Sequence, residues 1–328
     1  MFRLMLILFV AVILLPAPKS SKEIRTVPGA LLISAKPVPL NTSDPQQREI
    51  GRLEYLEGWE LKSDHPSFGG LSAMVLRPDG RIIALNDSGD LFGLRLPHEN
   101  EGIREFIAPL PIRPEERNWP KWKWDSEGLM YDPESNRYWV TFELIHRICR
   151  YSPAFARVEE CQEPKAMRDW PSTAGAEAAV RLPDGRFLIF AEGAYGPKGS
   201  TEILLFSSDP AAPGPAPVRL GYQPPQGYRI TDAAWLEPGK LLTLNRRVTI
   251  FDGFTTKLAM VDIDDLSSGK LLQAQEIATL RPPLLADNFE GLAVSSEGKR
   301  HIVWMASDDN HQFFQRTLLL KFSLKPPE

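Results

Sequence analysis

Residues 177–192 read Glu-Ala-Ala-Val-Arg-Leu-Pro-Asp-Gly-Arg-Phe-Leu-Ile-Phe-Ala-Glu. Apolar and β-branched residues flank Asp184-Gly185, a dipeptide that supplies the positive φ angles of a two-residue hairpin turn. The stretch therefore predicts two antiparallel strands. In such a hairpin Glu177 and Glu192 lie directly opposite one another, about 5 Å apart at Cβ. Two like charges at that distance repel, so we expect a cation or a shared proton nearby.

This pattern occurs five times, and successive copies begin 50 to 58 residues apart. Further strands are expected after each hairpin, which makes about four strands per unit. Repeats of this length built from strands are typical of β-propeller blades rather than of helical solenoids. The other four hairpins are residues 72–87 around Asp79-Gly80, 127–143 around residues 132–136, 232–246 around Pro238-Gly239, and the residues from 290 onward around Glu297-Gly298.

We therefore predict an all-β fold, a β-propeller with five four-stranded antiparallel blades. The last unit lacks an outer strand of its own after Phe322, whereas residues 52–61 have the pattern of a single strand. An N-terminal strand that completes the last blade would close the ring and protect the sheet edges. A sixth blade formed partly from residues 24–60 remains open.

Composition fits one repeat-built domain. The chain has 328 residues, of which 43 % are apolar, so it can bury a large core. Its net charge is −4 and it contains no basic run, which argues against a surface that binds nucleic acid through phosphate contacts. Thirty prolines and 23 glycines fit many tight turns and argue against a helical fold.

The first 22 residues are expected to direct export. Arg3 precedes an unbroken apolar run from Leu4 to Leu15, which is of signal-peptide length and short of the ~20 residues of a membrane-spanning helix. We expect a periplasmic or secreted protein, with the membrane involved only if this segment is retained as an anchor. Residues 23–50 are proline-rich and indicate a linker or extended arm, and residues 51–328 form the propeller domain.

Two other features each allow two interpretations. Cys149 and Cys161 flank a predicted hairpin tip, so in an oxidising compartment they form either a disulfide or two separate thiols. Residues 113–124 form a loop with three tryptophans and alternating bases. This loop is either a lid whose lysines meet an anionic substrate or a loop pinned to the surface by its aromatic side chains.

Several familiar catalytic patterns are missing. The sequence has no Gly-x-Ser-x-Gly, so Ser72 is not a nucleophile elbow. It also has no His-Glu-x-x-His, no Cys/His cluster and no phosphate-binding glycine loop, and its five histidines are scattered.

Carboxylates remain as candidates. In a closed ring, equivalent positions of the innermost strands meet at one mouth of the central channel, so we expect Ser72, Glu127, Glu177, Asp232 and Glu290 to gather there. Asp87, Glu143, Glu192 and Asp308 lie near the facing strand ends. Many oxygen ligands and no soft ones suit Ca²⁺, with Mg²⁺ as the alternative. The competing interpretation is that each acid accepts hydrogen bonds or pairs with a base, as Asp232 would with Arg246 opposite it.

Four basic side chains lie near the acids in the repeat scheme. Arg246, Arg247, His311 and Arg316 are candidate substrate-binding groups, and Glu127, Glu177 and Glu290 are candidate catalytic residues. A cation ringed by acids, with these bases beside it, would polarise a phosphoryl group and activate water.

The motifs resemble a known family, the phytase-like proteins described as having esterase-like activity, over roughly residues 50–325. The resemblance implies a secreted or periplasmic β-propeller and a phosphoester or other ester substrate. Asn245 departs from the pattern, because an acid is expected before the paired arginines. The motifs that carry the resemblance are Phe68-Gly69-Gly70-Leu71-Ser72, Asn86-Asp87-Ser88-Gly89, Asp125-Ser126-Glu127-Gly128-Leu129, Ala176-Glu177-Ala178, residues 229–235 with Leu244-Asn245-Arg246-Arg247, Asn288-Phe289-Glu290-Gly291-Leu292, Ser307-Asp308-Asp309-Asn310 and residues 315–319.

Two functional hypotheses follow. The first is an exported hydrolase that uses a divalent cation to cleave a phosphate ester or another ester of a small molecule. The second is a non-catalytic envelope propeller that binds a ligand or partner protein at its mouth, since the fold alone does not determine function.

Overall fold

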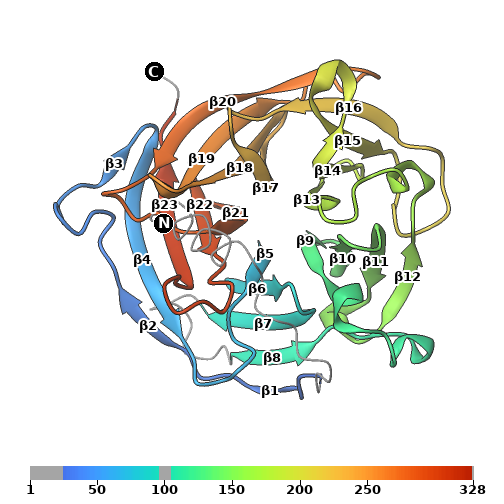
Figure 1. Ribbon diagram of the computed structural model, residues 1–328, viewed down its shortest axis with the longest axis horizontal. Coiled ribbons are helices and arrows are strands. Elements are labelled where there is room, and N and C mark those ends of the chain that lie inside the picture. Colours follow the sequence, from blue (N-terminus) through green and yellow to red (C-terminus); the bar gives the residue numbers. More distant parts are fainter. Residues whose placement is uncertain (1–24, 96–104, 327–328) are drawn as a thin grey trace, which may run out of the picture.

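The computed structural model describes residues 25–95 and 105–326 and contains a ring of five antiparallel blades (Figure 1). The all-β fold and the five-blade count predicted from the repeats are confirmed, and the described residues form no sixth blade. Blade 1 contains β5 (Leu71–Leu76), β6 (Arg81–Asn86), β7 (Asp90–Arg95) and β8 (Phe106–Pro109). Blade 2 contains β9 (Ser126–Asp132), β10 (Arg137–Phe142), β11 (Arg147–Tyr151) and β12 (Val158–Gln162).

The remaining blades follow in chain order. Blade 3 contains β13 (Ala176–Arg181), β14 (Phe187–Tyr195), β15 (Thr201–Phe206) and β16 (Val218–Gln223). Blade 4 contains β17 (Arg229–Glu237), β18 (Lys240–Thr249), β19 (Gly253–Asp262) and β20 (Leu271–Leu280). Blade 5 contains β21 (Phe289–Glu297), β22 (Arg300–Ser307), β23 (Leu318–Leu324) and the N-terminal strand β4 (Leu53–Lys62).

Strand β4 closes the ring, as the sequence predicts. It pairs antiparallel with β23, from Leu53 opposite Leu324 to Glu60 opposite Leu318. In Figure 1, β4 lies on the outer side of β23, while β5, β9, β13, β17 and β21 surround the axis. Each of these inner strands contacts the next, and β21 contacts β5. The edges of the first and last units are thereby covered.

Of the two interpretations of residues 23–50, a linker or an extended arm, the described part from residue 25 onward has the form of an arm that packs against the body. Strand β1 (Gly29–Ala30) extends blade 1 beside β8, and β2 (Ser34–Pro37) and β3 (Glu49–Ile50) both pair with β4. Leu31 and Leu40 are buried. The predicted signal segment, residues 1–22, lies outside the described residues.

Packing between blades forms the core. Five clusters of buried apolar side chains are found in the described chain, one between each pair of neighbouring blades. One of them joins Leu244 of blade 4 to Phe289 and Leu320 of blade 5. Each sheet is therefore buried on both faces, which explains why the strands read as nearly continuous apolar runs rather than as alternating patterns.

The Asp184-Gly185 turn differs from the predicted two-residue form. Gly185 N–H donates to Leu182 O (3.0 Å), and Leu182 N–H donates to Arg186 O (2.8 Å), so the loop contains three residues. Gly185 has φ +87°, whereas Asp184 is not among the residues with positive φ. Only the glycine needs the left-handed region, as in a type I turn followed by a bulge. The Asp79-Gly80 turn repeats these contacts.

Every inner strand carries a β-bulge at its start. In blade 3, Ala176 pairs with Ala191 and Ala178 pairs with Phe190, which leaves Glu177 as the extra residue. Glu177 and Glu192 are therefore not a directly opposed pair, contrary to the prediction. The extra residues of the five inner strands, which we call the bulge positions, are Ser72, Glu127, Glu177, Thr231 and Glu290.

The cysteines form a disulfide. Cys149 of β11 and Cys161 of β12 are paired across the outer edge of blade 2, with a Cα–Cα distance of 4.1 Å. Within the described ranges, no helix has the length and apolar character needed to cross a bilayer.

Candidate functional site: an acidic mouth

The bulge positions bring three carboxylates to one end of the central channel, which we call the acidic mouth. Glu127, Glu177 and Glu290 occupy equivalent places at the starts of β9, β13 and β21. The extra residue bends each strand and directs its side chain away from the regular ladder. The charges of Glu177 and Glu290 raise the pKa of Glu127, and the charge of Glu290 raises that of Glu177. The structure therefore brings these three residues close to one another.

Glu127 and Glu177 lie where negative charge is concentrated in the mouth. Burial, together with the charges of Glu177 and Asp125, raises the pKa of Glu127 well above its usual range. Burial, together with the charge of Glu192, raises the pKa of Glu177 in the same way. Such a pair favours a shared proton, with one carboxyl group neutral and the other ionised.

Arg246 supplies positive charge beside Glu290 and Glu192. Its guanidinium donates to Glu290 Oε1 and to Asn288 Oδ1, and it lies 4.0 Å from Glu192 Oε1. Asn288 Nδ2 also donates to Glu290 Oε1 (3.1 Å) and to Asp308 Oδ2 (3.2 Å). Burial opposes the charge on Arg246, but the surrounding carboxylates raise its pKa. Arg246 is thus a fixed cation within the acidic mouth.

Four further acids, which we call the outer acids, lie around the three bulge glutamates: Asp87, Glu143, Glu192 and Asp308. Asp87 and Glu290 both help to raise the pKa of Asp308, although burial is the largest cause. Glu143 accepts a hydrogen bond from Gly175 N–H (3.2 Å), and Glu192 pairs with Arg229 (3.3 Å). All four predicted outer acids therefore lie at the acidic mouth, held by blades 1, 2, 3 and 5.

Asp232 was assigned to the wrong position. The bulge residue of β17 is Thr231, and Asp232 pairs with Leu244 one step further along the strand. Its carboxylate accepts backbone hydrogen bonds from Ala233 (2.8 Å) and Leu292 (2.7 Å), and the residue opposite Arg246 is Arg229. Asp232 therefore neither faces Arg246 nor belongs with the other acids. Burial raises its pKa well above the usual range.

The remaining basic candidates are not all at the centre. Arg247 pairs with Asp252 (3.3 Å) and lies over the Tyr228 ring, so the adjacent arginines diverge as neighbours on a strand do. Arg316 lies 3.5 Å from Asp287. His311 is close to Asp87, because a Cβ placed on Gly70 would be 3.3 Å from His311 Nε2 and 3.5 Å from Asp87 Oδ1.

Asn245 and the tryptophan loop have structural contacts. The buried Asn245 side chain accepts a hydrogen bond from Tyr222 O–H (2.7 Å) and donates to Thr243 O, so it points into the core rather than into the mouth. In the loop, Trp119 packs against Trp124, and Trp124 packs against Phe142. The interpretation of an aromatically pinned loop is therefore supported, and Lys123 lies over Trp119.

The acidic mouth fits a cation by charge but contains no preformed metal cage. Oxygen donors are the ligands that Ca²⁺ and Mg²⁺ prefer. No positive group is among the main influences on the Glu127 pKa, whereas Arg246 balances Glu290. In the part of the chain that the structure describes, no three His, Cys, Asp or Glu side chains are spaced to hold one metal ion. The metal-ligand assignment remains a prediction.

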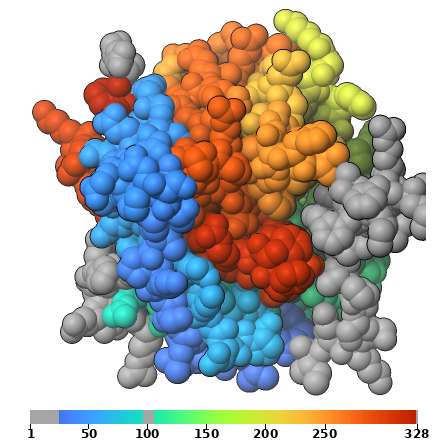
Figure 2. All heavy atoms as spheres, turned by 60° about the vertical axis from the view of Figure 1, so that its left-hand side comes forward, coloured from blue at the N-terminus to red at the C-terminus, as the bar shows by residue number. Residues whose placement is uncertain are grey.

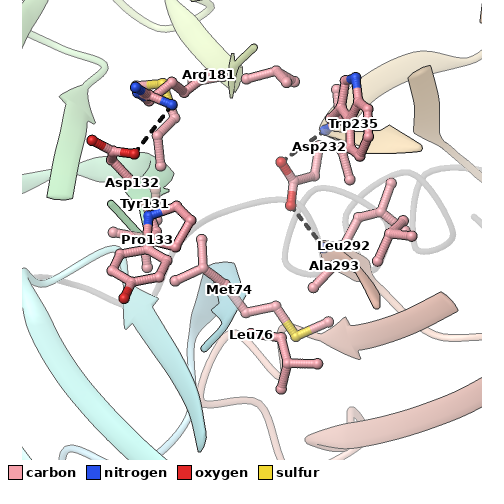
Figure 3. A pocket seen from close by; sticks show the side chains of 18 of the residues that line it. Met74, Leu76, Tyr131, Asp132, Pro133, Arg181, Asp232, Trp235, Leu292 and Ala293 are labelled. Carbon is pink, nitrogen blue, oxygen red and sulfur yellow. Dashed lines mark hydrogen bonds and ion pairs between the residues drawn. The ribbon is translucent and has the colours of Figure 1, made fainter. Parts of the chain in front are cut away.

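A mainly apolar cavity of about 400 Å³ occupies the other end of the channel and is lined by all five inner strands. Figure 3 shows Asp232 and Trp235 on one side of it and the Asp132–Arg181 ion pair on the other. Dashed lines mark the backbone contacts of Asp232, which join blade 4 to blade 5. Asp232 thus has a structural role at the wall of this cavity.

Sequence reasoning missed three residues of the acidic mouth. Asn288 links Glu290 to Asp308, Arg229 pairs with Glu192, and Asp125 raises the pKa of Glu127. Asn288 and Asp125 each precede a bulge glutamate by two residues. That spacing was a usable signal, because the bulge brings a residue at this distance close to the glutamate.

The chain matches the model of one protein family. The match is to "Phytase-like: Esterase-like activity of phytase" and covers residues 66–311, which is more than half of the chain. No curated protein matches. Similar solved structures include the Malassezia sympodialis allergen Mala s 1, at 12 % identity over 84 % of this chain and 91 % of the allergen, with a TM-score of 0.46. The WD40 repeats of RRP9 match at 7 % identity over 88 % of this chain and 100 % of theirs, with a TM-score of 0.44.

Kuenenia stuttgartiensis hydrazine synthase is also similar, at 12 % identity over 76 % of this chain, with a TM-score of 0.39, and the match spans 59 % of the synthase chain. Sequence identities this low bear on the fold alone. The family match covers the segment from Pro66 to His311, which includes all five bulge positions. The chain therefore belongs to the phytase-like family of β-propeller proteins.

Proposed function

We propose that the acidic mouth hydrolyses a phosphate ester or another ester of a small molecule. The observation that carries this proposal is the half-buried Glu127 beside the buried Glu177: both pKa values are raised, and the charge of Glu177 contributes to the rise at Glu127. Two coupled carboxyl groups provide both an acid and a base near neutral pH. Membership of a family described by esterase-like activity supports the same class of reaction.

In this mechanism the ionised member of the pair accepts a proton from water as the water oxygen attacks the phosphorus or carbonyl carbon. The neutral member donates its proton to the leaving alkoxide, so the product alcohol is released uncharged. Arg246 orients an anionic group of the substrate through the part of its guanidinium not used by Glu290 and Asn288. Acid and base roles then exchange, and the net reaction consumes one water.

We further propose that a divalent cation, Ca²⁺ or Mg²⁺, binds beside Glu127 and Glu177, with Glu143 and Glu192 as outer donors. Its chemistry there is the polarisation of the phosphoryl or carbonyl oxygen. The support is a local excess of negative charge: no positive group is among the main influences on the Glu127 pKa, and Arg246 is the smallest of those on the Glu177 pKa. Export to the periplasm or the medium is also proposed, and the Cys149–Cys161 disulfide supports it because disulfides persist in oxidising compartments.

The test is hydrolysis of 4-nitrophenyl phosphate, bis(4-nitrophenyl) phosphate and 4-nitrophenyl acetate, with and without chelator. Glu127→Gln and Glu177→Gln are each expected to lower kcat by about a hundredfold or more, because general acid–base catalysis contributes that much. The control Glu54→Gln replaces an exposed glutamate of β4 and is expected to keep full activity.

The outcomes separate the hypotheses. Loss of activity in chelator with recovery in Ca²⁺ or Mg²⁺ would support the cation, and full activity in chelator would remove it from the mechanism. Unchanged activity in both glutamate variants would remove the carboxyl pair. If the wild-type protein hydrolyses none of the three esters, the non-catalytic ligand-binding hypothesis takes its place.

A further inference from the structure

Large apolar side chains project from the face of the propeller that carries the acidic mouth. Phe313 is 98 % exposed, Phe251 is 91 % exposed and Tyr195 is 89 % exposed. We call the set of such residues on this face the apolar tips, and it also includes Trp122, Ile250 and Phe314.

The topology explains why the apolar tips share a face. In each blade the connection from the second to the third strand lies at the end of the channel where the inner strand begins. Tyr195 ends β14, Ile250 and Phe251 lie between β18 and β19, and Phe313 and Phe314 lie between β22 and β23. Trp122 lies in η2 (Lys121–Trp124), just before β9 begins at the same end. The tips therefore surround the acidic mouth.

This face differs from an ordinary protein surface in its exposed aromatic side chains. In Figure 2 red atoms near the C-terminal end of the chain lie beside blue atoms of its N-terminal part. Single exposed apolar residues are ordinary. Aromatic side chains at the ends of several loops on one face indicate a surface that a membrane or another molecule covers. At the opposite end of the channel, Val218 and Trp235 are exposed but much less so, and the strongly exposed Leu32 lies on the arm between β1 and β2.

The N-terminal arm joins the body on the same face. Arg25 donates to Leu110 O and lies over the Trp124 ring, while Thr26 donates to Asp90 Oδ2. Asp90 begins β7 and Trp124 immediately precedes the start of β9, so both belong to the mouth end. The apolar run that ends at Leu15 is ten residues upstream of Arg25 in sequence. Arg25, where the described residues begin, therefore lies on the face that carries the tips.

We propose that this face docks on a zwitterionic lipid bilayer, with the apolar tips inserted among the headgroups. Aromatic side chains favour the membrane interface, and separate loop tips need no complementary flat surface. Ammonium groups of zwitterionic headgroups complement the acidic mouth that the tips surround. A second copy of this chain fits poorly, because a face-to-face dimer would bring two acidic mouths together. The proposal does not depend on the proposed hydrolysis.

The test uses the full chain, in which both native cysteines are in the disulfide. A fluorophore is attached to Phe251→Cys, to Phe313→Cys or to Leu32→Cys. Leu32 is the matched control, because it is 86 % exposed and follows Leu31, whose N–H donates to Glu105 O just before β8 begins, at the end of blade 1 away from the mouth. Phosphatidylcholine vesicles, with and without a spin-labelled lipid, are then added.

We expect the spin-labelled lipid to quench the fluorophore strongly at positions 251 and 313 and weakly at position 32. The quenching at 251 is expected to fall when Phe313→Ser and Phe314→Ser are added, and to be weaker on phosphatidylglycerol vesicles. Equal quenching at all three positions would overturn the proposal, even if the apolar N-terminal run holds the protein on the vesicle. Burial of the 251 and 313 fluorophores without lipid, with a doubled mass in solution, would favour a dimer and also overturn it.

Discussion

Glu177 illustrates how a bulge turns an ordinary glutamate into a reactive one. In a regular ladder this side chain would have one cross-strand neighbour, but as the extra residue of β13 it is influenced by Glu192, Glu290 and Glu143. Arg246 is the smallest of its main influences and acts in the opposite direction. The carboxylate is therefore surrounded by more negative than positive charge, and burial adds to the cost of its ionised form.

This imbalance predicts a pH-dependent gain in stability for Glu177→Gln. A group with a raised folded-state pKa stabilises the protein fully below its unfolded pKa, about 4.5 here, and that stability is lost as the pH rises through the folded value. At pH 8 the neutral amide avoids this loss, so we expect Glu177→Gln to exceed the wild type in free energy of unfolding by about 1 kcal/mol or more. At pH 4, below the unfolded pKa, the difference should nearly vanish.

Denaturant unfolding of both proteins at pH 4 and pH 8 provides the measurement. Glu54→Gln, on the exposed side of β4, serves as the control and should show no such dependence. A difference of the same size at both pH values would mean that Glu177 ionises as an ordinary surface glutamate.

At the level of the element, the bulges also connect the blades. Where the bulge residue has a hydroxyl group instead of a carboxylate, it donates to the next inner strand. Ser72 Oγ donates to Ser126 O (2.7 Å), and Thr231 Oγ1 donates to Phe289 O (3.1 Å). Each of these carbonyl groups directly precedes a bulge glutamate, Glu127 or Glu290. Ser72 and Thr231 thus each hold the next inner strand in place. Each of these strands carries a catalytic candidate, Glu127 or Glu290.

We therefore expect Ser72→Ala to lower the free energy of unfolding by about 1–2 kcal/mol, because a buried carbonyl group loses its hydrogen-bond donor. Chemical denaturation measures this loss. Ser296→Ala is the matched control, since Ser296 is an exposed serine on the inner strand β21. Equal stability of Ser72→Ala and the wild type would show that the contact between blades 1 and 2 contributes nothing.

The sequence predicted the elements better than their register. Apolar runs on either side of a turn sequence defined each hairpin, because local turn chemistry and burial determine them; in three hairpins the turn is an Asp-Gly or Pro-Gly pair. The bulges left no trace in the apolar pattern, so strict pairing placed Glu177 opposite Glu192. Thr231 and Asp232 are adjacent polar residues, and only the pairing of Ile230 with Asn245 identifies Thr231 as the bulge residue. The contacts of Arg246 with blade 5 depend on packing between blades, which local sequence does not encode.

At the scale of the whole molecule, the acidic mouth exists only while the ring is closed. Glu127 and Glu177 belong to blades 2 and 3, whereas Glu290 and Asp308 belong to blade 5, and blade 5 is completed by residues from the other end of the chain. Tyr55 and Leu53 of β4 lie in the same buried cluster as Phe322 and Leu244. The N-terminal strand is thus part of the structure that positions the acids.

Removing residues 1–62 is therefore expected to abolish cooperative folding rather than merely to shorten the protein. The loss of β4 would leave β23 as an open edge and expose its buried side chains, and such edges promote association between chains. We expect aggregation or a broad, non-cooperative thermal transition. A peptide of residues 49–66, which contains β4, should restore part of the cooperative transition when it is added to the truncated chain during refolding. A peptide of the same composition in scrambled order should not, since closure depends on the pairing of Leu53–Glu60 with β23. A truncated chain that unfolds as cooperatively as the full protein would show that four blades and an incomplete fifth are stable alone, and the acidic mouth would then not depend on ring closure.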